Sequence, residues 1–473
     1  MESLFLTRVL GVLRSAGDEA LFVLDGRVTS YGQALDLVFR LYAGLPEGGV
    51  VAIDAGNRPE TVLLQIAAQL RGATVLLVAA SASLPDRLAA VSAAGVTTLV
   101  TDQVTEWPAD DGRVVSLDEL VTREGTEPAA LPGSVTVIFP TGGTTGVPKL
   151  IRHSGIYDGM AHIFAPDPAG PGRTLLIAPM THMTGNATVL GALLRRETVV
   201  LQKGFDVRAV LDAIAEHRVT SVSLTPARLA AVLDHRAMAS TDVSSVRQLS
   251  LGAAPLPPRR LAQALDVFGP VVGQGYGLTE APMIASISAV ELDGRPERLE
   301  SVGRIVPGME ARIDDGEILV RGLSMMDGYH GAPPIRDGWL RTGDLGRFDD
   351  EGYLYLLDRA NDVIITGEHG TKVFSTVVEN ALARHPLVRS VAVFGVPGEG
   401  GEGERVHAVV VPVSPGTLSA DEIRAHARDF FGREHFVPSD VDFADALPLT
   451  AIGKVDKRAL RAPFWTGHDR HIA

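Results

Sequence analysis

Phe139-Pro-Thr-Gly-Gly-Thr-Thr-Gly-Val-Pro-Lys149 begins on the last residue of an apolar run over residues 135–139, so a strand is expected to lead directly into this loop. Glycine lets consecutive backbone N–H groups converge on an anion, while the threonine hydroxyls and Lys149 add further donors. The loop is not a Walker A motif, because Pro148 rather than glycine precedes the lysine. A flexible polar turn is the alternative. The position of this segment directly after an expected strand favours an anion-binding loop in an α/β protein.

The segments before this loop alternate between short apolar runs and amphipathic stretches. Strands are expected at residues 50–55, 73–78 and 97–101, and helices at residues 59–70 and 86–94. Such alternation predicts a mostly parallel sheet flanked by helices. The same pattern resumes with the run at 135–139 and continues to about residue 275.

The pattern changes after Gly303. Short apolar runs at residues 311–313, 316–320 and 353–357 are separated by Asp-Gly and Glu-Gly pairs, which predicts antiparallel hairpins. From Arg359 onward the tail reads as a small α+β domain. Its strands are expected at residues 388–396 and 406–413, and its helix at residues 420–431.

Composition restricts the classes of function. The 473 residues are 45% hydrophobic and 21% charged, as in globular proteins with more than one domain. A net charge of -14 argues against nucleic acid or an anionic membrane as the partner, and the absence of cysteine excludes disulfides and thiolate metal sites. Arg8 and Arg14 interrupt the apolar N-terminus, so neither a signal peptide nor a membrane span is expected there, and a cytoplasmic location is predicted.

A second glycine-rich loop follows another apolar run, in Val-Val-Gly-Gln-Gly-Tyr-Gly-Leu-Thr-Glu over residues 271–280. Tyr276 could stack on a base, Thr279 could bind a phosphate, and Glu280 could hold a magnesium ion. Taken alone, this motif is equally compatible with a structural turn.

A third motif, Asp-Gly-Trp-Leu-Arg-Thr-Gly-Asp over residues 337–344, is followed by Leu-Leu-Asp-Arg over residues 356–359. A carboxylate such as Asp344 can accept hydrogen bonds from paired ribose hydroxyls, and Arg359 can bind phosphate or ribose. A surface hairpin explains the Asp-Gly pair but not the Thr-Gly-Asp sequence that ends the motif.

The fourth motif, Leu-Pro-Leu-Thr-Ala-Ile-Gly-Lys over residues 447–454, lies near the end of the chain. A lysine on a turn-prone loop could be delivered into the active site of another domain. By itself, Lys454 would be interpreted as a solvated surface lysine.

Together with residues 178–183 and 252–256, the four motifs occur in the order found in one superfamily, and in this combination the chain resembles the acyl-CoA synthetases, peptide-synthetase adenylation domains and firefly luciferase. The resemblance implies an α/β N-terminal domain over residues 1–358, with two α/β sheet subdomains and a small β-barrel-like part. It also implies a small mobile α+β C-terminal domain over residues 359–473, which carries Lys454 and turns about a hinge near Asn361.

The resemblance also assigns roles to individual residues. Lys454, Thr279, Glu280 and Lys149 are the expected catalytic residues, with Glu280 as the magnesium ligand and Lys454 as the bridge between the acid and the transferring phosphate. The expected ATP- and AMP-binding residues are Thr141, Gly142, Gly143, Thr144, Thr145, Gly146, Ala253, Ala254, Gly275, Tyr276, Asp344 and Arg359. The expected acyl and thiol tunnel contains His182, Gly185 and Gly367.

The implied activity is an acid–thiol ligase, which forms an acyl-AMP from ATP–Mg²⁺ and a carboxylic acid and passes the acyl group to coenzyme A. Amino-acid-activating relatives place an aspartate in the motif that here spans residues 181–185 and contains no carboxylate. Because a buried ammonium without a partner is costly, we expect a non-amino acid, and the nearby Met180, Met183 and Ala187 favour a hydrophobic one.

Several alternatives share the fold: a stand-alone enzyme that loads a carrier protein, a nucleotide-binding protein without catalysis, and an oxidoreductase of the luciferase type. A further alternative is an enzyme biased toward thiol transfer from pre-formed acyl-AMP. It rests on Gly142 in place of serine, Asn361 in place of a charged hinge residue, and a loop over residues 366–373 that is about two residues longer than usual. The alternative is that Asn361 serves as an ordinary hinge and the loop only reshapes the thiol tunnel. Ser375 and Val377, in place of the usual proline and glutamate, are further departures in the same region.

Overall fold

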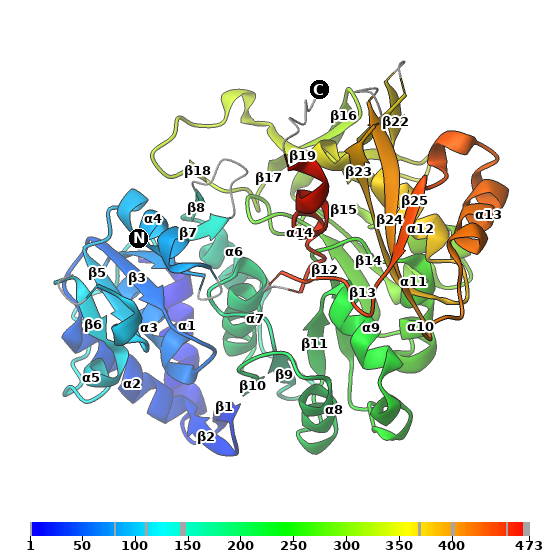
Figure 1. Cartoon of the computed structure of the whole chain (residues 1–473). Helices are drawn as coiled ribbons and strands as arrows, with labels where there is room; N and C mark the ends of the chain where they lie inside the picture. The colour runs from blue at the N-terminus through cyan, green and yellow to red at the C-terminus, as the bar shows by residue number, and fades with distance from the viewer. Residues whose placement is uncertain are drawn as a thin grey trace.

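The computed structural model describes residues 2–79, 82–108, 112–141, 148–367, 370–398, 403–450 and 453–466. Its described residues form four sheets, of seven, nine, four and five strands. Figure 1 shows how the elements of these sheets are arranged. A large N-terminal part contains the first three sheets and a smaller C-terminal part contains the fourth, which confirms the predicted fold class. Within the described ranges, no helix combines the length and apolar character that crossing a membrane requires.

The seven-stranded sheet has the order β18-β8-β7-β4-β3-β5-β6. Its parallel centre confirms the strands and crossover helices expected in the first part of the sequence. These elements are β3 (Val50–Asp54), α3 (Pro59–Leu70), β4 (Thr74–Leu77), α4 (Leu84–Ala93), β5 (Thr98–Thr101), β6 (Val114–Ser116) and β7 (Thr136–Thr141). At one edge, β8 (Lys149–His153) and β18 (Gly328–Tyr329) run antiparallel.

The nine-stranded sheet has the order β15-β14-β13-β12-β11-β9-β10-β1-β2, with a parallel run from β13 to β1. Its strands are β1 (Ala20–Leu24), β2 (Arg27–Ser30), β9 (Arg173–Leu176), β10 (Thr198–Leu201), β11 (Ser221–Leu224), β12 (Gln248–Gly252), β13 (Val272–Tyr276), β14 (Ala285–Ser288) and β15 (Arg304–Ile305). The helices α1 (Leu4–Ala16), α2 (Tyr31–Gly44), α3 and α7 (Met183–Leu194) share one apolar core with both large sheets, which fixes the sheets relative to each other.

The third sheet is the antiparallel four-stranded counterpart of the predicted barrel-like part. It consists of β16 (Met309–Asp314), β17 (Glu317–Gly322), β19 (Leu340–Phe348) and β20 (Leu354–Arg359), in that order. The C-terminal sheet consists of β21 (Ile364–Thr366), β22 (Thr371–Val373), β23 (Val388–Pro397), β24 (Glu404–Pro412) and β25 (Asp440–Phe443). Its helices are α12 (Ser375–Leu382), α13 (Ala420–Phe431) and α14 (Lys457–Arg461). The chain passes from the four-stranded sheet to the C-terminal sheet between β20 and β21. The domain boundary at residues 358–359 stays a prediction.

Candidate active site

The loops that carry the predicted site residues follow the carboxyl ends of parallel strands. The first glycine-rich loop follows Thr141 at the end of β7, residues 253–254 follow β12, and residues 277–280 follow Tyr276 at the end of β13. In open α/β sheets this edge is where ligands bind, because the loops there converge without a covering helix. The third sheet and the C-terminal loop around Lys454 contribute the remaining groups.

Asp344 and Arg359 lie opposite each other on β19 and β20 and form an ion pair, with 2.7 Å between Arg359 Nε and Asp344 Oδ1. Tyr276, at the end of β13, donates its hydroxyl to Asp344 Oδ2 at 2.6 Å. Burial raises the pKa of Asp344, while Arg359, Tyr276 and Lys454 counteract that rise. Since a carboxylate offers about four acceptor positions, Asp344 keeps capacity for a pair of hydroxyl groups.

Gly252 and Gly275 are register partners on the neighbouring strands β12 and β13. A Cβ atom at Gly252 would come within 2.7 Å of the Gly275 carbonyl oxygen, so this strip of sheet excludes side chains. The next residue, Ala253, has φ +69°, a left-handed conformation that is costly for a residue with a Cβ atom. A flat strip beside a strained turn suits the approach of a planar ring such as the adenine expected near Ala253, Ala254 and Tyr276.

Glu280 and Lys149 come together through Tyr329, a residue that no sequence motif indicated. The Tyr329 hydroxyl donates to Glu280 Oε1 at 3.1 Å, and Lys149 Nζ lies 5.3 Å from the centre of the tyrosine ring. His153 Nε2 lies 2.8 Å from the carbonyl oxygen of Thr279 and fixes the backbone of the second motif. Tyr329 belongs to the two-residue strand β18, which is too short for a periodicity argument to detect.

Thr141 and Lys149 are register partners at the end of the β7–β8 hairpin, so the first motif joins two antiparallel strands. This placement confirms the strand expected before the loop. Gly142, Gly143, Thr144, Thr145 and Gly146 lie outside the described residues.

The loop that carries Lys454 docks against the N-terminal part. Thr225, which precedes α9 (Pro226–Asp234), donates its hydroxyl to the Gly453 carbonyl oxygen at 3.0 Å. A Cβ atom at Gly453 would lie 3.0 Å from both Thr225 Oγ1 and Arg228 Nε, and its φ of +78° further favours glycine. Neither Thr225 nor Arg228 stood out in the sequence, because nothing local marks a residue that contacts the chain more than 200 positions later.

Lys454 lies within electrostatic range of His182, Arg359 and Asp344. Burial and the nearby Arg359 lower the pKa of Lys454, and Asp344 counteracts the decrease. The structure therefore brings His182, from residues 178–183, and Asp344 and Arg359, from the third motif, close to Lys454. A cation held beside a carboxylate and a guanidinium can neutralise charge that develops on a bound phosphate.

His182 occupies the N-cap position of α7 without a side-chain capping hydrogen bond, and its Nε2 atom is buried without a hydrogen-bond partner among the described residues. Burial, with a smaller contribution from Lys454, lowers the pKa of His182 from 6.5 to about 4. The imidazole is therefore neutral at physiological pH. Gly185, in the first turn of α7, is needed for packing, since a Cβ atom there would lie 2.1 Å from the Pro179 carbonyl oxygen.

The pKa of His182 predicts an acid-sensitive contribution to stability. Because the folded state disfavours the protonated ring, stability is retained above pH 6.5 and declines as the pH falls toward 4. The full difference corresponds to about 3 kcal/mol. We expect the loss of unfolding free energy between pH 7 and pH 4.5, measured by urea denaturation, to be smaller for His182→Gln than for the wild type. Equal losses in both proteins would contradict the burial effect.

A cavity of about 450 Å³ lies beside the Lys454 loop. Its walls are the loops after β3, β9 and β10, the start of α9, and Leu449, Thr450 and Gly453 of the Lys454 loop. Thr181, Phe205 and Arg228 contribute side chains to it. Arg228 has its guanidinium carbon 5.3 Å from the Phe205 ring centre and forms no ion pair in the described part of the chain. Arg228 thus gives the lining of this cavity a positive charge, and the lining includes Thr181, the residue before His182.

The hinge region shows why serine suits position 375. Ser375 donates both its backbone N–H and its hydroxyl to the buried carboxylate of Asp358, at the end of β20. Proline, expected there by family resemblance, has no N–H group to donate. Lys457 binds the same serine at 2.8 Å and pairs with Glu379 at 2.7 Å. This network anchors α12 to β20 next to Asn361, whose role as the hinge stays a prediction, as does the tunnel role of Gly367.

Comparisons with known proteins agree with this geometry. A sequence family described as AMP-binding enzyme matches residues 12–330, and one described as AMP-binding enzyme C-terminal domain matches residues 377–454. The chain is 33% identical to a medium/long-chain-fatty-acid–CoA ligase of Mycobacterium tuberculosis, over 98% of this chain and 88% of that protein. It is also 33% identical to a feruloyl-CoA synthase of Amycolatopsis sp., over 93% and 94% of the two chains.

Among solved structures, the chain is similar to the amide bond synthetase McbA from Marinactinospora thermotolerans. The TM-score is 0.84 at 30% sequence identity, with 97% of this chain and 99% of that chain covered. The likeness therefore extends over both the N-terminal part and the C-terminal domain.

Proposed function

This chain belongs to the AMP-binding enzyme family and is an AMP-forming acid–thiol ligase with ATP and coenzyme A as substrates, and we propose that its acid is a hydrophobic carboxylic acid without an α-amino group. The position of Lys454 beside Asp344, Arg359 and His182 supports the adenylation chemistry, whereas the absence of a carboxylate in residues 181–185 carries the proposal about the acid. That group unites a nucleotide-binding pair, a mobile-domain cation and the entrance to the acyl site.

In the first half-reaction, a carboxylate oxygen of the acid forms a bond to the α-phosphorus of ATP, and the bond from that phosphorus to the bridging oxygen of pyrophosphate breaks. Catalysis of such a step is mainly positioning and charge neutralisation. We assign the ribose hydroxyls to Asp344, the α-phosphate to Thr279, and the bridging cation to Lys454. Lys149, next to the first loop, is assigned to the departing pyrophosphate.

Glu280 is the residue we assign to Mg²⁺. Among the described residues, no three acidic, histidine or cysteine side chains gather into a preformed metal cage. That fits magnesium bound with ATP, because this ion commonly uses one or two carboxylates together with substrate phosphates and water. When bound, the ion would neutralise phosphate charge. Tyr329 orients Glu280 through the 3.1 Å hydrogen bond to Oε1.

In the second half-reaction, the thiol sulfur forms a bond to the acyl carbon, AMP leaves with the electron pair of the acyl–oxygen bond, and the thiol proton passes to solvent. We propose that the thiol arrives through the cavity beside Gly453, Arg228 and Thr181 after the Lys454 loop has moved. A neutral His182 leaves that route without an extra charge near the acyl group. A cytoplasmic location, where both cosubstrates are available, is part of the proposal.

The apolar residues next to His182 in the chain support a hydrophobic acid. Met180, which precedes α7, and Met183, its first residue, are buried on either side of Thr181 and His182. Residues 181–185 contain no carboxylate to pair with a substrate ammonium. The similar proteins named above act on fatty acids and on ferulate, so aliphatic and aromatic acids both belong in a test.

We expect medium-chain fatty acids or aryl-propenoic acids to support ATP-dependent hydroxamate formation at least about 10-fold faster than any α-amino acid, because an unpaired buried ammonium costs more than about 1.4 kcal/mol. The measurement is hydroxamate formed from ATP, Mg²⁺, hydroxylamine and a panel of acids. An amino acid that exceeds every hydrophobic acid would overturn the assignment.

The same panel distinguishes the acceptors. The best acid is offered with coenzyme A, with a carrier protein bearing a phosphopantetheine thiol, and with a primary amine, since an amide bond synthetase shares the fold. Acyl-CoA as the dominant product supports the proposal. Acid-dependent exchange of pyrophosphate into ATP separates it from an enzyme that only transfers pre-formed acyl-AMP.

A further inference from the structure

The start of α10 (Pro258–Phe268) contacts the turn between α12 and β23, far from the nucleotide residues. Arg259 directs one guanidinium nitrogen, Nη1, at the carbonyl oxygens of His385, Pro386 and Val388, at 3.2, 3.3 and 3.5 Å. A charged donor aimed at several carbonyls binds that turn without requiring any particular side chain on it.

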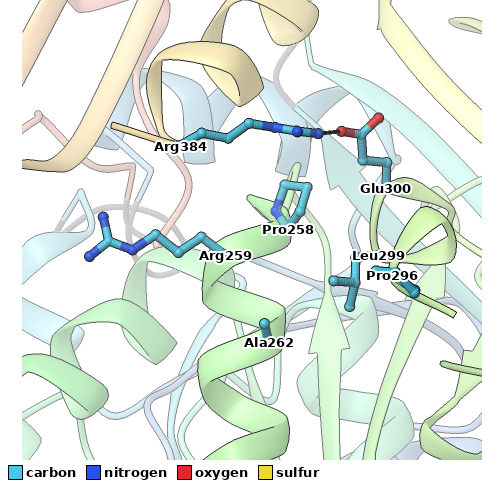
Figure 2. A pocket seen from close by; sticks show the side chains of 7 residues that line it. All are labelled: Pro258, Arg259, Ala262, Pro296, Leu299, Glu300 and Arg384. Atoms are coloured by element: carbon cyan, nitrogen blue, oxygen red, sulfur yellow. Dashed lines mark hydrogen bonds and ion pairs between the residues drawn. The ribbon is translucent and has the colours of Figure 1, made fainter. Parts of the chain in front are cut away.

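Two further contacts flank Arg259. Arg384, just after α12, forms an ion pair with Glu300 at the end of the 3₁₀ helix over residues 296–300. Figure 2 shows the two side chains meeting above a cavity whose floor is formed by Pro258, Ala262 and Leu299. On the other side of Arg259, Arg260 donates to the carbonyl oxygen of Arg389 at 3.1 Å while it pairs with Asp234.

All three contacts join the N-terminal part to the body that delivers Lys454. Residues 384–389 comprise the connection after α12 and the first two residues of β23, and α14, which follows Lys454 closely, packs on β23. A rotation that withdraws Lys454 from Asp344 also moves the 384–389 turn away from α10. These contacts are therefore present when Lys454 faces the nucleotide site and are broken when Lys454 is withdrawn.

We propose that Arg259 and the Arg384–Glu300 ion pair are positioning residues for the adenylation step, which act by holding the C-terminal domain so that Lys454 stays in the site. We call these three residues the α10 clasp. The proposal rests on the proposed function, because it concerns how that ligase divides its time between two half-reactions.

The ratio of the adenylation rate to the acyl-transfer rate measures the effect of the α10 clasp on the position of the C-terminal domain. If one arrangement forms acyl-AMP and another transfers it, each rate is proportional to the population of its arrangement. The ratio of rates then changes by the full equilibrium factor, whichever arrangement predominates. An exposed ion pair contributes modestly, so reversing one charge, which also adds repulsion, should lower the ratio of adenylation to transfer about 3- to 10-fold.

The experiment compares Arg384→Glu, Glu300→Arg and the double variant with the wild type. Adenylation is measured as pyrophosphate exchange with the best acid of the panel, and transfer as acyl-CoA formed from the synthetic acyl-AMP of that acid and coenzyme A. Arg321→Glu is the matched control, because Arg321 pairs with Glu310 at 2.7 Å and similar exposure but within the N-terminal part. Arg259→Ala tests the carbonyl contacts separately.

The proposal expects each single reversal, and Arg259→Ala, to lower the ratio while Arg321→Glu leaves it unchanged, and the double reversal to restore it. An unchanged ratio in the single variants, or a fall in both rates together without rescue, would overturn the α10 clasp. Failure of the proposed function looks different, because the wild type itself would then show no exchange with any acid.

Discussion

Replacing Lys454 with alanine is expected to slow acid-dependent pyrophosphate exchange about 100- to 1,000-fold, the cost typical of losing one preorganised charge-stabilising group. Lys454 lies among Asp344, Arg359 and His182, where burial lowers its pKa and strengthens its interaction with a phosphate. Acyl transfer from synthetic acyl-AMP should change less than about threefold, because the lysine must leave before the thiol can enter.

The control for this variant is Arg428→Ala, which removes a surface cation from the same domain. Arg428 lies on α13 and pairs with Glu434, away from the nucleotide site. Both half-reactions should proceed normally in the control. Equal losses of exchange and of transfer in Lys454→Ala would show that the lysine supports the fold or both steps, and the assigned role would be wrong.

Local patterns predicted the elements of this fold well where burial is continuous. The helix expected at residues 59–70 is α3 without a shift of either end, and the helix at 420–431 is α13. The parallel strands were recognisable because both faces are covered, which leaves uninterrupted apolar runs. The glycine-rich loops could be predicted as binding loops because each comes directly after an apolar strand. A glycine- and threonine-rich segment in that position is seldom needed for the fold alone.

Non-local pairing could not be predicted in this way. β1 and β2 leave the first part of the chain and join β10 of the nine-stranded sheet, although their sequence neighbours build the seven-stranded one. Residue contacts show the same limit: Tyr329 reaches Glu280 and Thr225 reaches Gly453 through the fold alone. Ion pairs such as Arg384–Glu300 cannot be predicted from the sequence either, because most arginine and glutamate residues of a chain do not contact each other in the fold.

Asp344→Asn is expected to lower kcat/KM for ATP about 100-fold, since two hydrogen bonds to a charged acceptor become weaker and Arg359 loses its counter-charge. The shape of the side chain is retained, and the asparagine oxygen still accepts from the Tyr276 hydroxyl. Burial raises the pKa of Asp344, so removing its charge also removes a desolvation cost. Thermal unfolding should therefore stay within a few degrees of the wild type, as expected for a change below about 1 kcal/mol.

The distinguishing feature of Asp344→Asn is that both half-reactions should suffer. The ribose that Asp344 is assigned to bind is present in ATP and in acyl-AMP alike, whereas Lys454 serves only the step that forms the acyl-AMP. Measuring exchange and transfer for both variants on the same substrates thus separates nucleotide binding from charge stabilisation. If Asp344→Asn impaired exchange but left transfer from synthetic acyl-AMP at the wild-type rate and KM, Asp344 would not be the ribose acceptor, and its pairing with Arg359 would serve only to position the arginine next to Lys454.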